Sequence, residues 1–116
     1  MQLEKVFQIT VYKPPEQADI ILQAIMKVAP LNYGKYQQVA WISAQGSEQF
    51  QPVSGSNPAM GKPGKTTRHP SVKIDFTIPR EPQLLHQVIT EAIYPHHPWE
   101  EPVIIIRKSQ AARKFS

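Results

Sequence analysis

Apolar and polar residues alternate near the start of the chain. Over residues 5–12, Phe7, Ile9 and Val11 fall on one side of an extended backbone, and mostly polar residues fall on the other. A period of two predicts a β-strand with one buried face. The alternation returns over residues 72–78, and apolar residues also predict strands over residues 37–43 and 103–106.

Two segments instead show apolar residues at helical spacing. Each begins beside a pair of prolines, Pro14-Pro15 and Pro79 with Pro82, and prolines are tolerated in the first turn of a helix. The first stripe is Ile20, Ile21, Ala24, Ile25 and Val28, and the second is Leu84, Leu85, Val88, Ile89, Ala92 and Ile93. We expect Pro30 to end the first helix and Pro95 to end the second.

The order of these elements predicts an α+β protein with a ferredoxin-like βαββαβ fold. Such a chain forms a four-stranded antiparallel sheet with two helices on one face. We expect a single domain over residues 1–106, with a long loop or hairpin extension at 44–70 and a basic flexible tail at 107–116. Within the loop, residues 48–53 are strand-like, and Phe50 and Val53 are the expected anchors.

The last predicted strand, Val103–Ile106, has no polar alternation, so both of its faces should be covered. The helices cover only one face of the sheet. A second copy of the chain would cover the other, which predicts a homo-oligomer. The alternative is that the long loop folds back over that face.

Charge and composition exclude several classes of protein. The net charge of +4 comes from residues 107–116, which hold four basic residues and no acid. Over residues 1–106 the basic and acidic residues are equal in number, so the charge does not predict nucleic-acid binding. The chain has no cysteine, which excludes disulfides and thiol chemistry. No apolar run approaches the roughly 20 residues of a membrane span, and the N-terminus lacks a signal-peptide layout, so we expect a cytoplasmic protein.

Residues 55–69 have the composition of an anion-binding loop. Gly61 and Gly64 allow close approach of backbone N–H groups, while Lys62, Lys65 and Arg68 supply positive charge. The spacing of the glycines does not fit the Walker phosphate-binding loop, and the segment precedes a strand. The alternative is a solvated loop without a ligand.

Two imidazoles and two carboxylates lie between residues 96 and 101. His97, His96 and Glu100, with His69, could bind a divalent metal. Carboxylate recognition of a basic group is a second possibility, and a purely structural turn is a third. Glu100 and Glu101 are adjacent, so their side chains would point apart in an extended segment. No serine lies in a nucleophile-elbow context, and we do not expect an enzyme.

Several short motifs together resemble a known domain. They are Asn32-Tyr33, Phe50-x-Pro52, Gly55-x-Asn57-Pro58-x-x-Gly61-x-x-Gly64 and His97-Pro98-Trp99-Glu100-Glu101-Pro102. This combination resembles the PII-like/CutA-like domain inserted in YqfO (NIF-three-like) proteins, here standing alone over roughly residues 5–106. Trp99 replaces the usual tyrosine of that motif. The resemblance implies a trimer, and it implies no catalytic metal site, because the metal-binding residues of the larger proteins lie in a flanking domain.

The sequence therefore predicts a non-enzymatic, trimeric regulatory or sensor domain that binds a small anionic effector or a protein partner between subunits. A divalent-metal (copper- or zinc-type) tolerance protein resembling CutA is the first alternative, and a metal-dependent hydrolase relative is the second. The expected ligand-binding residues are Asn57, Gly61, Lys62, Gly64, Lys65, Arg68, Glu100 and Glu101.

Overall fold

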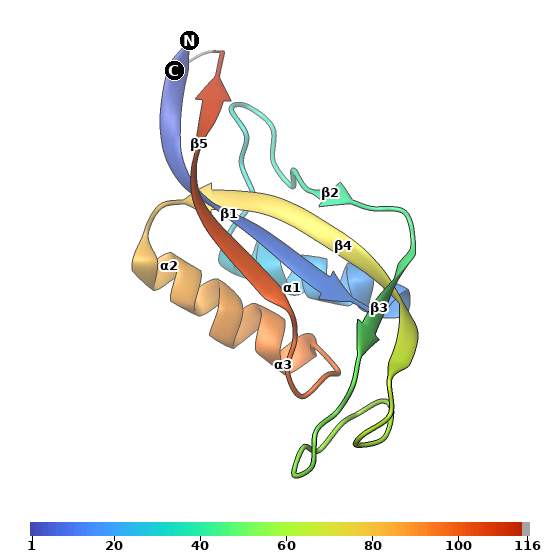
Figure 1. Ribbon diagram of the computed structural model, residues 1–116. Helices are drawn as coiled ribbons and strands as arrows, with labels where there is room; N and C mark the ends of the chain where they lie inside the picture. Colours follow the sequence, from blue (N-terminus) through green and yellow to red (C-terminus); the bar gives the residue numbers. More distant parts are fainter. Residues whose placement is uncertain (115–116) are drawn as a thin grey trace.

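The computed structural model describes residues 1–114, and its strands form one antiparallel sheet (Figure 1). The strands are β1 (Gln2–Lys13), β2 (Trp41–Ile42), β3 (Gly46–Phe50), β4 (Thr67–Pro79) and β5 (Ile104–Arg113). Their order is β2-β4-β1-β5, and β3 also pairs with β4. Because β2 and β3 pair with successive parts of β4, they act as one interrupted strand. The predicted ferredoxin-like α+β fold is confirmed.

The helices lie on one face of this sheet (Figure 1). A 3₁₀ turn, Pro15–Gln17, leads into α1 (Ala18–Val28), and α2 (Pro82–Gln87) continues through a π-helical segment, Val88–Ile93, into α3 (Tyr94–His96). The core between the layers holds the alternating residues of β1 and β4 and the predicted helical stripes, except that Ile20 of the first stripe is exposed. Its fully buried aliphatic side chains include Ile9, Val11, Ile21, Ile25, Ile74, Val88 and Ile93. Burying each such side chain stabilises the fold by about 1.5–3 kcal/mol.

The second helical run passes through Pro95 and ends at His96, so the expectation that Pro95 stops it is wrong. A proline ring inside an α-helix clashes with the carbonyl one turn earlier. Here the widened π-helical segment lies immediately before Tyr94. We infer that its longer hydrogen-bonding pattern relieves that clash.

The predicted strand at 37–43 is regular only at Trp41–Ile42, and much of the predicted loop 44–70 is a hairpin. β3 pairs with the first half of β4, from Gly46 opposite Ser71 to Phe50 opposite Thr67. The strand-like character of residues 48–50 is thus confirmed. Val53 is 69% exposed and is not an anchor, whereas its neighbour Pro52 is buried.

The last strand is longer than expected, and the flexible tail predicted from residue 107 is wrong as far as Arg113. β5 pairs with β1 along its whole length, from Ile104 opposite Val11 to Arg113 opposite Gln2. Hydrogen bonds and ion pairs from polar side chains outside β5 stabilise its second half, and the sequence pattern did not reveal them. The Arg80 guanidinium, for example, donates from Nη2 to the Ser109 carbonyl at 2.6 Å. Residues 115 and 116 of the predicted tail lie outside the described residues.

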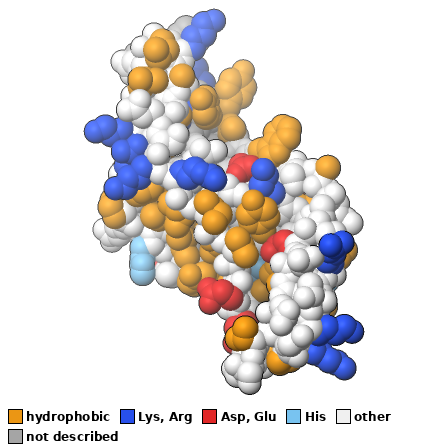
Figure 2. Space-filling view, in the orientation of Figure 1, with side chains coloured by type: hydrophobic (Ala, Val, Ile, Leu, Met, Phe, Trp, Pro, Cys, Tyr) orange, Lys and Arg blue, Asp and Glu red, His pale blue; other side chains and the backbone are white. Residues whose placement is uncertain are grey.

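The other face of the sheet carries exposed apolar side chains. Trp41 and Ile105 are 65% and 40% exposed, and the register aligns them across the sheet with Asp75 and Thr10 between them. Figure 2 shows hydrophobic side chains interspersed with charged ones over the strands. The hairpin projects beyond the sheet and does not fold back over it (Figure 1). Among residues 1–114, no helix is long and apolar enough to cross a membrane.

Ending the chain after Ile106 tests whether the second half of β5 supports the fold. The truncation removes the pairing of residues 107–113 with β1 and leaves residues 2–8 of β1 without a partner on that side. We expect a fall of at least about 10 °C in the melting temperature, or an insoluble product, because several hydrogen bonds of about 1 kcal/mol each are lost. Thermal unfolding followed by circular dichroism measures the change. Deleting only residues 115–116 is the control, and an unchanged melting temperature after the longer deletion would contradict the expectation.

Candidate functional site

The segment that joins α3 to β5 is fixed to the end of β1 by His97. The side chain is buried, and its Nε2–H donates to the Tyr12 carbonyl at 2.8 Å. Nδ1 accepts the backbone N–H of Trp99 at 3.2 Å. Burial, the largest effect, lowers the pKa of His97, and the nearby charge of Lys13 acts in the same direction. His97 is therefore a neutral brace with both ring nitrogens engaged.

Trp99 is the centre of an aromatic cluster that joins this segment to the hairpin. Its ring centroid lies 5.5 Å from that of Phe50 on β3, 6.0 Å from that of His69 on β4 and 5.7 Å from that of His97. Tilted and edge-on arrangements like these are the favoured geometries for aromatic pairs. The tryptophan at this position therefore holds three separate elements together.

Glu100 fixes the tip of the hairpin. Both of its carboxylate oxygens accept the backbone N–H of Asn57, at 2.9 and 3.1 Å. A charge-assisted hydrogen bond of this kind is stronger than a neutral one. Inside the hairpin, Gly64 donates its N–H to the Pro52 carbonyl, and Arg68 donates from Nε to the Gln49 side chain. The predicted ligand residues Asn57 and Glu100 are thus in contact with each other.

A cleft of about 250 Å³ lies between the hairpin and this segment. Its apolar lining includes Phe50, Pro52, Met60, Trp99 and Val103. Its charged lining consists of Glu48, Glu100 and Glu101, and no lysine or arginine of the part of the chain that the structure describes contributes to it. The cleft as formed by one chain therefore favours a hydrogen-bond donor or a basic group.

The basic residues of the hairpin lie elsewhere. Lys62, Lys65 and Arg68 are exposed and none of them lines the cleft. Figure 2 shows basic side chains gathered on one flank of the hairpin and acidic ones on the other. Gly61, at φ +82°, approaches Thr67 and Phe50 so closely that an added Cβ would contact them at 3.0 and 3.3 Å. The predicted ligand set is therefore divided between two opposite flanks.

The four predicted metal-binding residues do not come together. His96 engages the Ala92 carbonyl through Nδ1, and His69 engages the Pro70 carbonyl through Nδ1. His97 is bonded to the Tyr12 carbonyl, and Glu100 accepts the Asn57 N–H. Within residues 1–114, no three His, Asp or Glu side chains are arranged so that they could hold a metal ion.

Two titratable groups near this segment did not figure in the sequence prediction. Glu48 accepts a hydrogen bond from the Ser71 hydroxyl, and burial raises its pKa despite that bond. Lys13 is fully buried, and the described residues offer no hydrogen-bond partner for its Nζ. Burial lowers the pKa of Lys13 to about 8, although Glu16 and Asp19 act in the opposite direction. The alternation Phe7, Ile9, Val11 already places residue 13 on the buried face, so this signal was present in the sequence.

Comparisons with known proteins agree with this architecture. No protein-family model matches the chain. A protein named "GTP cyclohydrolase 1 type 2 homolog" from Listeria monocytogenes is 30% identical over 97 residues, which cover 84% of this chain and 25% of that protein. A protein of the same name from Mycobacterium leprae is 26% identical over 96 residues, covering 83% of this chain and 24% of that protein. The chain thus spans about a quarter of the length of the curated relatives it matches.

Solved structures show the same fold. A Bacillus cereus protein related to NIF3 superposes with a TM-score of 0.75 at 24% identity, covering 94% of this chain and 27% of that one. The divalent ion tolerance protein CutA1 from Ehrlichia chaffeensis superposes with a TM-score of 0.67 at 14% identity, covering 96% and 87%. The chain therefore has the CutA-like, ferredoxin-like fold that also occurs within a NIF3-related protein, as the resemblance in its motifs implied.

The buried amine of Lys13 predicts a pH-dependent stability. Below about pH 8 both the folded and unfolded chains carry the charge, so the cost of burying it is fully present. Between about pH 8 and the usual lysine pKa of about 10.4, only the unfolded chain holds the proton, so the free energy of unfolding rises with pH. Lys13→Met should remove this rise and should stabilise the protein at pH 7 by up to about 3 kcal/mol.

Urea unfolding at several pH values measures this difference. Lys65→Met removes an exposed lysine of the hairpin and is the matched control, for which we expect the wild-type pH dependence. Parallel wild-type and Lys13→Met curves from pH 7 to 10.5 would show that the amine is solvated in the folded protein.

Proposed function

We propose that this chain is a non-enzymatic regulatory or sensor domain that assembles as a homo-oligomer, a trimer, and binds a small anionic effector or a protein partner at the boundary between copies. The observation that carries the proposal is the row Trp41-Asp75-Thr10-Ile105 across the sheet face opposite the helices, whose two apolar end residues are exposed. Exposed large apolar side chains rimmed by polar groups are typical of interaction surfaces. A second copy of the same chain is the simplest partner that covers such a surface.

The chemistry of the row supports an interface between copies. Trp41 and Ile105 flank a polar centre in which the Thr10 hydroxyl donates to the Asp75 carboxylate, and the Lys73 ammonium lies 3.7 Å from that carboxylate. The polar groups at the centre are thus already paired, and covering them would leave few of their hydrogen bonds unmade. The exposed aromatic and aliphatic side chains would supply the area that drives association.

The roles of the polar segment 97–101 support a binding domain rather than an enzyme. Each of its most prominent groups already has a structural partner: His97 the Tyr12 carbonyl, and Glu100 the Asn57 amide. A general base or nucleophile must itself lie within hydrogen-bond reach of the substrate and be free to exchange a proton or form a bond with it. These side chains instead hold the hairpin in position beside the sheet.

The two flanks of the hairpin suit two kinds of contact. The basic flank, with Lys62, Lys65 and Arg68, would attract an anionic effector through charge and exposed backbone N–H groups. The acidic cleft beside Trp99 would accept a basic side chain, and Arg107 and Lys108 are exposed on β5. In a closed ring, one copy presents such a side chain to the cleft of the next.

Replacing Ile105 with glutamate tests the oligomer. A charge buried in an apolar interface costs several kcal/mol, so Ile105→Glu should convert the assembly to monomers. Sedimentation velocity at micromolar concentration measures the mass. Ile20→Glu is the matched control, because Ile20 is 52% exposed on α1, away from this face. A monomeric wild-type protein, or an unchanged oligomer with Ile105→Glu, would overturn the proposal.

The same preparations test the effector. A thermal-shift screen over nucleotides, acidic metabolites and divalent metals should find an anion that raises the melting temperature of the wild-type oligomer. Changing Lys62 and Lys65 together to glutamate should abolish that shift. A shift produced only by a divalent metal, and lost with His97→Ala, would support the tolerance-protein alternative instead.

A further inference from the structure

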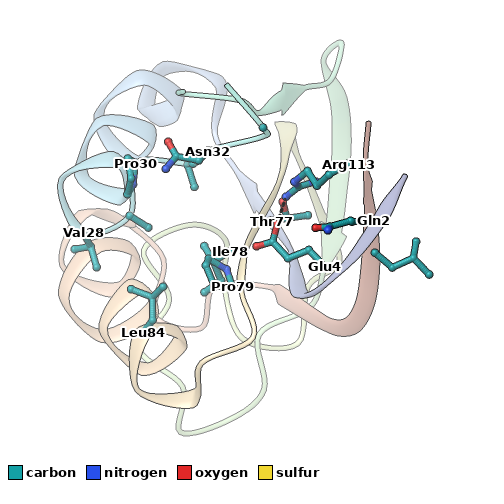
Figure 3. A pocket seen from close by; sticks show the side chains of 14 residues that line it. Gln2, Glu4, Val28, Pro30, Asn32, Thr77, Ile78, Pro79, Leu84 and Arg113 are labelled. Atoms are coloured by element: carbon teal, nitrogen blue, oxygen red, sulfur yellow. Dashed lines mark ion pairs between the residues drawn. The ribbon is translucent and has the colours of Figure 1, made fainter. Parts of the chain in front are cut away.

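A second and larger cleft lies at the opposite end of β1 from the hairpin. Its volume is about 590 Å³, which is within the usual range of about 300–1,000 Å³ for small-molecule sites. One wall is the end of α1 with the residues that follow it and Leu84 of α2, and the other is the paired start of β1 and end of β5 (Figure 3). None of its lining residues belongs to the hairpin or to the segment 97–103.

Arg113 is the unusual residue of this cleft. Its guanidinium carbon lies 3.6 Å from the centroid of the Tyr33 ring, and its Nη2 lies 2.9 Å from a carboxylate oxygen of Glu4. The side chain is only 10% exposed, yet its buried Nη1 has no acceptor within the part of the chain that the structure describes. Buried guanidinium groups normally have their donors satisfied. A hydrogen-bond acceptor on a bound ligand would satisfy the remaining Nη1 donor of Arg113.

The charges of the cleft define the kind of ligand. Among the described residues 1–114, Arg113 and Glu4 are the only charged residues that line it, and they form an ion pair. A polyanion such as a nucleotide would be bound weakly here, because Arg113 is the single cation and the Glu4 carboxylate already neutralises it. A ligand with one positive and one negative group matches the pair instead, because each charge meets a partner of opposite sign.

The remaining lining is mostly apolar. Figure 3 shows Val28, Pro30 and Leu84 across the cavity from Arg113 and Glu4, with Ile78 between the two sides. Gln2, Asn32 and Thr77 add neutral polar groups. Small-molecule sites typically combine an apolar wall with a few polar groups that fix orientation.

We propose that this cleft binds a free α-amino acid with a large apolar side chain. Its carboxylate accepts hydrogen bonds from Arg113, and its ammonium group pairs with Glu4, whose side chain is 40% exposed. Its side chain lies against Val28, Pro30 and Leu84. The site uses residues different from those of the proposed effector surface, so each can fail without the other.

Calorimetric titration of the full chain with L-leucine, L-methionine and L-phenylalanine tests the proposal. We expect at least one of them to bind, and we expect binding to weaken at least about tenfold when either charge is missing from the ligand. For L-leucine the two analogues are isopentylamine, which lacks the carboxylate, and 4-methylpentanoate, which lacks the ammonium group. Equal affinity for 4-methylpentanoate and L-leucine, or no heat with any of the three amino acids at millimolar concentration, would overturn the proposal.

Variants locate the site. Arg113→Gln should lower the affinity at least about tenfold. Arg68→Gln removes a basic residue of the hairpin and should leave the affinity unchanged. Because Arg113 also supports β5, Leu84→Trp provides a second variant that narrows the cleft and leaves the ion pair intact. Binding that survives Leu84→Trp, or that falls equally with Arg68→Gln, would place the ligand elsewhere.

Discussion

The pairing of β1 with strands on both of its sides is the constraint on which the rest of this structure depends. Its register with β4 places Phe7, Ile9 and Val11 opposite Ile78, Phe76 and Ile74, so that apolar side chains from both strands face the helices. A slip of one residue would turn all of them to the open face. The same register fixes where β4 extends beyond β1, and the hairpin is built on that extension.

The polar segment 97–101 is best understood as the connection between this sheet and the hairpin. His97 holds it to β1, Trp99 holds it to β3 and β4, and Glu100 holds the hairpin tip. Residues that look like metal ligands in sequence thus act mainly as hydrogen-bond partners of backbone groups. The consequence for function is that the hairpin presents a fixed shape, with opposite charges on its two flanks (Figure 2).

Much of the fold could be predicted because its periodic patterns reflect one buried face. The stripes of both helices and the alternation in β1 and β4 identified the core residues apart from Ile20, which is exposed, since each element packs only one side against the other layer. The second strand was harder, because residues 37–40 are irregular and β2 is only two residues long. The second half of β5 was missed because its residues Arg107–Arg113 are mostly polar and are held by side chains from distant elements.

The sequence by itself determined the order of elements, the apolar core and the position of the polar segment, because these follow from local spacing. Only the tertiary structure decided which polar groups meet. It joined Glu100 to Asn57, separated Lys62 and Lys65 from the acidic cleft and placed Arg113 over Tyr33. Such contacts depend on strand register and loop direction across tens of residues, and no local pattern of charge or hydrophobicity encodes them.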